Sequence, residues 1–202
     1  MTNPPVMLWT DCETTGLDEK HDVVLEVGFK ITDIFGARIA QWKSLVSDVT
    51  WLDRVEDAEQ DEFVGPMHRR SGLWSDWKKS LDDESCQPRL VQDSFMEWAA
   101  DHDIRHGTLP MCGSTVHFDR MMYRRWLPDI ETFFHYRNID MSTLKELCQM
   151  LNPSIWSGRG WSDDDKFHRP FEDINHSLEE YKFYRENFLW VDTPYSGVSG
   201  KI

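Results

Sequence analysis

Apolar residues recur at every second position between residues 23 and 31, and this period of two is typical of a β-strand. The segment before it, Val6–Cys12, is apolar, leans towards β-structure and ends in a polar Asp-Cys-Glu-Thr-Thr-Gly turn. Residues Ile34–Ala37 indicate a tight turn into a third strand, Arg38–Val46. Three consecutive strands with short connections predict an antiparallel meander at the start of the chain.

A helical pattern replaces this alternation after residue 52. Residues 52–103 are polar, rich in Trp and helix-leaning, with a break near Gly72. Within this stretch Leu90–Ala100 has the better helical pattern. This part of the chain is therefore expected to contribute helices and no strand.

Strands and helices alternate in the second half of the chain. Leu109–Gly113 is an apolar run of strand length, and the helix expected at Phe118–Trp126 is ended by Pro128. Asn138–Met141 is a further candidate strand. The sequence Thr143-Leu-Lys-Glu146 fits a capping box that opens a helix over Leu144–Leu151.

The last part of the chain combines a loop, a helix and a tail. A loop rich in Gly and Asp, Ser157–Asp165, precedes a helix whose apolar residues fall near one face. These apolar residues are Ile174, Leu178, Tyr181 and Phe188. Strands first, then alternating helix and strand, predict an α/β fold with a mixed five-stranded sheet flanked by helices. We expect residues 1–191 to form one domain and residues 192–202 a flexible C-terminal tail.

Composition and cysteine usage narrow the class of protein. With 202 residues, 40% of them hydrophobic and 13% aromatic, the chain can build one well-packed core. Apolar runs fall short of the ~20 residues that span a bilayer, and the start lacks a signal-like segment. A cytoplasmic protein without a membrane segment is expected. The four cysteines form no CxxC pair, which favours buried reduced thiols over a zinc site.

The charge balance bears on possible partners. Lys and Arg number 22 against 36 Asp and Glu, which leaves a net charge of −14. Proteins that grip long nucleic acids neutralise many phosphates with cationic side chains. A nucleic-acid substrate of this chain is therefore expected to be short, or to be reached through metal ions and a few placed cations.

Candidate chemistry begins with two carboxylates at the end of the first expected strand. Asp11 and Glu13 are two residues apart, so both point to the same face of the strand while Cys12 points to the other. Adjacent carboxylates repel each other unless a cation joins them or a pKa rises. Oxygen ligands suit a hard ion such as Mg²⁺ or Mn²⁺. An isolated Asp-x-Glu sequence of this kind can equally be two solvent-exposed acids in a turn.

Three further residues extend this pair into a recognisable pattern. Asp119 opens the helix after the Leu109–Gly113 strand, and Asp173 follows His168 by five residues at the start of the last helix. Singly, each acid could be a helix cap and the histidine a loop residue. Together with Asp11 and Glu13 they form D-x-E … D … H-x4-D, which resembles the DEDDh motif of 3′–5′ exonucleases such as proofreading exonucleases and ribonuclease T.

Longer segments are similar to the oligoribonuclease family within that superfamily. The stretch FFHYRNIDMSTLKEL at 133–147 resembles the family's FHYR and STLKEL block. Further matches run along nearly the whole chain: LWTDCETTGLD at 8–18, HRRSGL at 68–73, CGSTVHFD at 112–119 and YKFYRENF at 181–188. The resemblance implies an RNase H-like fold, a homodimer, and cleavage of short single-stranded RNA down to dinucleotides.

The resemblance also implies a mechanism and its residues. Two divalent ions, Mg²⁺ or Mn²⁺, would be held by Asp11, Glu13, Asp119 and Asp173. His168 would act as general base, a role that suits a side chain whose unperturbed pKa lies near neutrality. One ion would help to generate the attacking hydroxide and the other would stabilise the leaving 3′ oxygen.

Substrate-binding residues are carried over from the family position by position. Leu17 corresponds to a leucine that wedges against a base, and Phe63 to a stacking aromatic that is usually Trp. Tyr136 corresponds to a residue that reaches a base from the partner subunit. The residues implied to cap the 5′ phosphate are His68, Thr115, Arg137 and Ser142. Hydroxyls and an Arg can pair a terminal phosphate and so close the site at a fixed length.

Some positions depart from the family pattern or have plainer explanations. Ser114 and Thr115 replace the family's Asn and Ser, and His117 and Phe118 replace Gly and Gln. Glu172 replaces the first Asp of a DD pair, and none of these changes removes a metal ligand. Ser142 could merely cap a helix, Arg137 could pair with a surface acid, and Phe63 could be core.

Two other functions remain open from the sequence. One is a DEDDh exonuclease that trims longer RNA or single-stranded DNA 3′ ends. The other is a non-catalytic module that binds nucleic acid on an RNase H-like scaffold, which the presence of all five catalytic residues disfavours.

Overall fold

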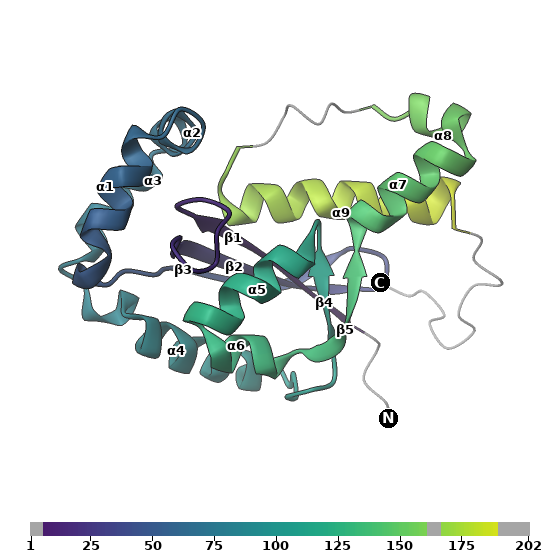
Figure 1. Ribbon diagram of the computed structural model, residues 1–202. Helices are drawn as coiled ribbons and strands as arrows, with labels where there is room; N and C mark the ends of the chain where they lie inside the picture. Colours follow the sequence, from purple (N-terminus) through teal and green to yellow (C-terminus); the bar gives the residue numbers. More distant parts are fainter. Residues whose placement is uncertain (1–5, 161–166, 190–202) are drawn as a thin grey trace.

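The computed structural model describes residues 6–160 and 167–189, and its centre is one mixed sheet (Figure 1). The strand order is β3-β2-β1-β4-β5. β1 pairs antiparallel with β2 and β2 with β3, whereas β4 pairs parallel with both β1 and β5. The strands are β1 (Val6–Thr14), β2 (Val24–Asp33), β3 (Arg38–Leu45), β4 (Pro110–Gly113) and β5 (His135–Asp140).

Helices fill the long connections between and after the strands. Two short 3₁₀ helices, η1 (Val49–Trp51) and η2 (Glu84–Cys86), flank the first three α-helices. The α-helices in the described residues are α1 (Leu52–Gln60), α2 (Val64–Ser71), α3 (Leu73–Ser80), α4 (Pro88–Asp101), α5 (Val116–Trp126), α6 (Pro128–Phe133), α7 (Met141–Leu151), α8 (Pro153–Ser157) and α9 (Pro170–Asn187).

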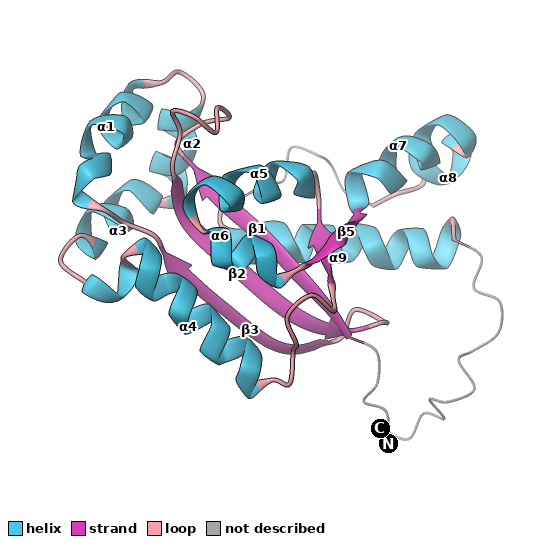
Figure 2. Ribbon diagram, turned by 60° about the horizontal axis from the view of Figure 1, so that its bottom comes forward, coloured by secondary structure: helices cyan, strands magenta, loops and turns pink. Residues whose placement is uncertain are grey.

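Helices cover both faces of the sheet (Figure 2). α4, α5 and α6 pack on one face over a large core that includes Phe29, Phe95 and Tyr123. α9 runs along the other face over a smaller core around Trp9 and Ile174. The mixed five-stranded sheet flanked by helices, and the antiparallel meander that starts it, are both confirmed.

The parallel strands place three chain segments at one edge. Because β1, β4 and β5 run in the same direction, their carboxyl ends lie together, the usual location of a site in an α/β sheet. α5 begins just after β4 and α7 directly after β5. The start of α9 lies against β1 and β2 on the opposite face from α5.

Several predicted boundaries in the second half of the chain were wrong. The capping box at Thr143–Glu146 does not open a helix, because α7 begins at Met141 and the Asp140 side chain caps it by accepting from the Ser142 N–H. β5 begins at His135, three residues before the predicted strand. Met141 is helical and not part of that strand.

Prolines begin two helices that were not predicted from the sequence. α5 ends at Trp126 as expected, but Pro128 occupies the first turn of an unpredicted helix, α6. Proline suits that position because the first helical N–H has no intrahelical acceptor. Pro153 likewise starts α8, which takes in Ser157, the first residue of the predicted loop. The break near Gly72 is confirmed, since this glycine separates α2 from α3 with a φ of 76°.

Other expectations have mixed outcomes. All four cysteines are free, with Cys12 partly buried and the others buried. No helix among residues 6–160 and 167–189 is long and apolar enough to cross a membrane. The predicted tail, residues 192–202, and residues 161–165 of the predicted loop lie outside the described residues.

Candidate active site at the carboxyl edge of the sheet

Three of the predicted metal ligands come together at the end of β1. Asp11, Glu13 and Asp173 each offer a carboxylate oxygen, and these three oxygens lie within 4.8 Å of one another. Asp11 and Glu13 share a face of β1 because strand side chains alternate. Asp173 lies in the first turn of α9, which packs on that face. The structure thus joins residues that are 160 positions apart in sequence, the range from Glu13 to Asp173.

A close contact between helix and sheet brings Asp173 to this position. Gly28 of β2 pairs in register with Asp11 of β1. A Cβ atom built at Gly28 would lie 2.5 Å from the Cβ of Pro170, nearer than side chains can approach. Only a glycine therefore leaves room for the first residue of α9 at this distance. One turn later, the N–H of Asp173 donates to the carbonyl of Arg169 at 3.1 Å.

The electrostatics of this carboxylate group favour a bound cation. Burial raises the pKa of Glu13 well above its usual value, and the nearby charges of Asp173 and Glu26 raise it further. Glu13 Oε1 is buried and has no hydrogen-bond partner among the described residues. A buried unpaired carboxylate oxygen is costly unless a ligand meets it. Three clustered carboxylates with such an atom fit a hard divalent ion.

Asp119 approaches β1 from the other face of the sheet. It lies one turn into α5, which begins at Val116, and not at the first helical position as expected. Its carboxylate accepts hydrogen bonds from the side chain and backbone of Cys12, so it lies outside the three-carboxylate group. Burial raises its pKa to about 7. A positive ion shared with the end of β1 would favour its ionised form.

His168 lies at the turn that leads into α9. Its φ of 54° is in the left-handed region, which few residues other than glycine adopt. Such strain persists where the surrounding structure holds it, and it is frequent at active sites. The imidazole is partly exposed, and its charge acts on the neighbouring His68. The predicted general base therefore lies near His68, two residues before α9 begins and five residues before Asp173.

His68 occupies a different environment from the one its family role suggests. It is completely buried on α2, where its Nε2 donates to the Thr14 carbonyl at 2.9 Å. Its Nδ1 lies 3.8 Å from Glu13 Oε2. Burial lowers the pKa of His68 to about 4, so the ring is neutral at physiological pH. In this conformation it supports the metal-ligand strand, and contact with a 5′ phosphate stays a prediction.

Leu17 and Phe63 line a common cavity of about 650 Å³. Their side chains are 80% and 84% exposed, which is unusual for apolar residues. Asp22 shapes the loop that carries Leu17 by accepting from the Thr15 hydroxyl and the Asp18 N–H. Phe63 therefore belongs to a surface and not to the core, as a base-stacking role requires.

The predicted phosphate-binding hydroxyls meet at the ends of β4 and β5. Thr115 Oγ1 lies 2.8 Å from Ser142 Oγ. Asp140 organises this pair, because its carboxylate accepts from the backbone N–H groups of Thr115, Val116 and Ser142 at 2.9–3.1 Å. One side chain thus caps the starts of both α5 and α7.

Tyr136 and Arg137 lie apart from these hydroxyls along β5, at the edge of the sheet. Tyr136 is 73% exposed, and the Arg137 guanidinium lies 5.4 Å from the centre of its ring. An exposed aromatic ring can stack on a base and the adjacent guanidinium can pair with a phosphate, so this pair suits contact with RNA bound at a partner subunit.

Four residues that shape the site were not predicted from the sequence. They are Gly28, Asp22, Asp140 and Arg169. Gly28, Asp140 and Arg169 contact distant segments, whereas Asp22 accepts from residues four and seven positions earlier. Only Asp140 carried a local signal, since an Asp directly before an apolar helical run is a preferred N-cap.

Comparisons with known proteins agree with this geometry. A family model described as Exonuclease matches residues 8–181. The oligoribonuclease of Chromobacterium violaceum is 36% identical over 188 residues, covering 92% of this chain and 96% of its own length. The oligoribonuclease of Neisseria meningitidis is 37% identical over 186 residues, covering 91% and 92%.

Solved structures show the same fold at low sequence identity. E. coli exonuclease I with zinc and single-stranded DNA matches with a TM-score of 0.60, 12% identity and 92% coverage of this chain. Exonuclease I of Methylocaldum szegediense matches with a TM-score of 0.57, 14% identity and 91% coverage. This chain spans 41% of the length of each. The RNase H-like fold expected from the sequence is confirmed.

Proposed function

Since the chain belongs to the oligoribonuclease family, we propose that it degrades short RNA from the 3′ end, down to dinucleotides, releasing 5′-mononucleotides. The observation that carries the proposal is the group formed by Asp11, Glu13 and Asp173, at the strand edge where Asp119 and His168 also lie. The chain is a hydrolytic nuclease and depends on divalent metal. Trimming of longer RNA or DNA fits the relatives less well.

Four carboxylates would hold the metal ions, Mg²⁺ or Mn²⁺: those of Asp11, Glu13, Asp119 and Asp173. When bound, two such ions supply Lewis acidity, lower the pKa of water and offset charge on the leaving oxygen. Asp119 reaches the site from α5 and Asp173 from α9, so the ligands bridge both faces of the sheet at the end of β1.

His168 takes the proton from the attacking water. Its partly exposed ring can release that proton to solvent after each turnover. The left-handed backbone at His168 presents the imidazole immediately before α9, the helix that carries Asp173, one of the acids that would hold the metal ions. His68 stays neutral behind Glu13 and holds the Thr14 carbonyl, which keeps the end of β1 in place.

Short substrates are selected by contacts at both ends of a dinucleotide. Leu17 and Phe63 hold the 3′ base in their cavity. The Thr115 and Ser142 hydroxyls donate to the 5′ phosphate, with Arg137 as a further donor. Few directed donors of this kind suit a protein with a net charge of −14, since a long RNA would meet repulsion along the surface.

The active form is a homodimer in the cytoplasm, and residues 1–191 form one exonuclease domain. Tyr136 and Arg137 lie on the edge strand β5, and their exposure supports a role at the site of the partner chain. In a dimer, Tyr136 and Arg137 of one protomer would lie beside the Thr115 and Ser142 hydroxyls of the other.

Directional, metal-dependent cleavage tests the proposal. We expect RNA labelled at its 5′ end to shorten by single nucleotides from the 3′ end in Mn²⁺ or Mg²⁺, and to stay intact in EDTA. Asp11→Ala should lose nearly all activity. Asp101→Ala, an exposed acid on α4, is the matched control and should keep it. Cleavage from the 5′ end, or full activity of Asp11→Ala, would refute the proposal.

A further inference from the structure

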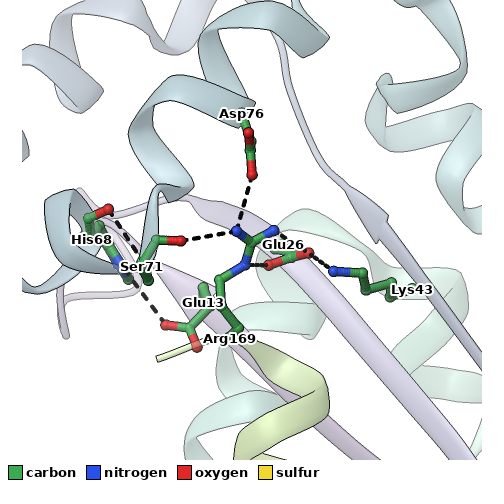
Figure 3. A network of polar contacts seen from close by, with 7 residues as sticks. All are labelled: Glu13, Glu26, Lys43, His68, Ser71, Asp76 and Arg169. Carbon is green, nitrogen blue, oxygen red and sulfur yellow. Dashed lines mark hydrogen bonds and ion pairs between the residues drawn. The ribbon is translucent and has the colours of Figure 1, made fainter. Parts of the chain in front are cut away.

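Arg169 connects the start of α9 to three other elements through its guanidinium (Figure 3). Nε and Nη2 donate to the two carboxylate oxygens of Glu26 on β2, at 2.6 and 3.0 Å. Nη1 donates to the Ser71 carbonyl at the end of α2 at 3.2 Å, and to Asp76 Oδ2 on α3 at 3.0 Å. Only 18% of the side chain is exposed.

The backbone of Arg169 lies between the two residues that need positioning. It follows His168 directly and forms the N-cap of α9. Its carbonyl accepts from the N–H groups of Glu172 and Asp173, both at 3.1 Å. Contacts that hold the Arg169 side chain therefore also hold its backbone in place. That backbone is bonded to His168, the proposed general base, and accepts a hydrogen bond from Asp173, a proposed metal ligand.

Glu26, the main partner, is itself part of the sheet beneath the site. It is 1% exposed and pairs in register with Glu13, the metal ligand on the adjacent strand. Its carboxylate also accepts from Lys43 Nζ at 2.9 Å. A carboxylate charge buried this deeply is costly unless cationic partners pair with it. Arg169 thus joins the α9 start to the same strand pair that carries Asp11 and Glu13.

The chemistry of the contact favours a positioning role over a stabilising one. A buried ion pair adds little net stability compared with an apolar pair of the same shape, because both charges lose their hydration. It does impose geometry, since a planar guanidinium with two bonds to one carboxylate accepts only one orientation. Lysine could not make this set of contacts.

We propose that Arg169 is a positioning residue that, through its bonds to Glu26 and Asp76, holds His168 and Asp173 in the geometry for hydrolysis. This inference rests on the proposed function, because it assigns Arg169 a part in that reaction. In this role Arg169 acts through His168 and Asp173 and not by direct contact with substrate or metal.

The test compares turnover and substrate binding in three variants. We expect Arg169→Ala and Glu26→Gln each to lower kcat on a dinucleotide about 10–100-fold, because small misplacements of catalytic groups are costly. KM should change less than about threefold, since the residues assigned to the bases and the 5′ phosphate are untouched. Arg89→Ala is the control. Arg89 is an exposed residue of α4 that pairs with Asp93 on the same helix and with Asp129 on α6, and its loss should leave kcat and KM unchanged.

The double variant Arg169→Ala/Glu26→Gln decides whether the two residues act as one unit. We expect it to lose no more kcat than the worse single variant, within about a factor of two. Losses that multiply, unchanged kcat in folded Arg169→Ala, or a rise in KM with constant kcat would each overturn the proposal. If Arg169→Ala does not fold, the nearly isosteric Glu26→Gln carries the test alone. An inactive unmodified protein would instead refute the proposed function.

Discussion

Gly28→Ala adds one carbon atom and should move Asp173 of α9 away from Asp11 and Glu13 of β1. The added Cβ would lie 2.5 Å from Pro170 Cβ, and 3.4 and 3.5 Å from atoms of Phe171 and Ile174. Touching carbons sit at roughly 3.5–4.0 Å, so the start of α9 must move by about 1 Å or more. The whole first turn, with Asp173, moves away from Asp11 as a result.

Two opposing effects set the expected stability of this variant. Replacing Gly by Ala inside a strand gains about 0.5–1 kcal/mol, because the unfolded chain loses freedom. Overpacking costs about 1–3 kcal/mol, and the contact with Pro170 is too short for side-chain adjustment alone. The second effect wins, so we expect a net loss of about 1–2 kcal/mol in the free energy of unfolding, measured by urea titration.

Activity should fall far more than stability does. A displacement of about 1 Å at a catalytic centre can cost about 100-fold in rate, and we expect this loss in kcat on a dinucleotide in Mn²⁺. Gly160→Ala is the control, since a Cβ there meets no atom within 4 Å. Gly28→Ala/Pro170→Gly removes the opposing Cβ and should recover part of the loss. Full activity and unchanged stability of Gly28→Ala would refute the role given to this close contact.

Three further predictions concern a buried cation, the base cavity and a shared helix cap. Burial lowers the pKa of Lys30 from 10.5 to about 8. Between pH 8 and 10.5 the Lys30 side chain is therefore protonated in the unfolded chain and deprotonated in the folded chain. The free energy of unfolding of the unmodified protein should rise with pH in this range relative to that of Lys30→Met, as measured by urea unfolding. The same pH dependence in both proteins from about pH 7 to 9.5 would contradict this. Leu17→Ala should raise KM for a dinucleotide about tenfold with little change in kcat, because base contacts are lost, and steady-state kinetics measure both. Asp140→Ala removes the acceptor of three backbone N–H groups and should cost about 2 kcal/mol in urea unfolding; a loss below 0.5 kcal/mol, roughly the size of a surface effect, would argue against the shared cap.

The sequence predicted those parts of the fold that depend on short-range pattern. Period-two alternation located β2, and the apolar run before the Asp-Cys-Glu turn located β1. Order and spacing of the motif residues identified Asp11, Glu13 and Asp173, which the structure then brings together. Short motifs succeed here because each one lies at the end of a single strand or the start of a single helix.

Most of the residues that escaped prediction act across long separations in sequence. Arg169 meets Glu26 over 143 positions, and Gly28 meets Pro170 across a similar range. No local pattern distinguishes these residues from a surface cation or a weak strand position. His68 was assigned to a phosphate from resemblance, yet its complete burial against β1 depends on how α2 packs. Packing of this kind is visible only once the helices are placed on the sheet.

The ratio of kcat/KM for a dinucleotide to that for a 20-nucleotide RNA of the same 3′ sequence tests the central claim most directly. The measurement uses 5′-labelled RNA, saturating Mn²⁺ and the unmodified protein, with Asp11→Ala as the background. We predict a ratio well above ten, because Thr115 and Ser142 would close the site around a 5′ phosphate. Comparable values for the two RNAs would contradict an enzyme built for short RNA.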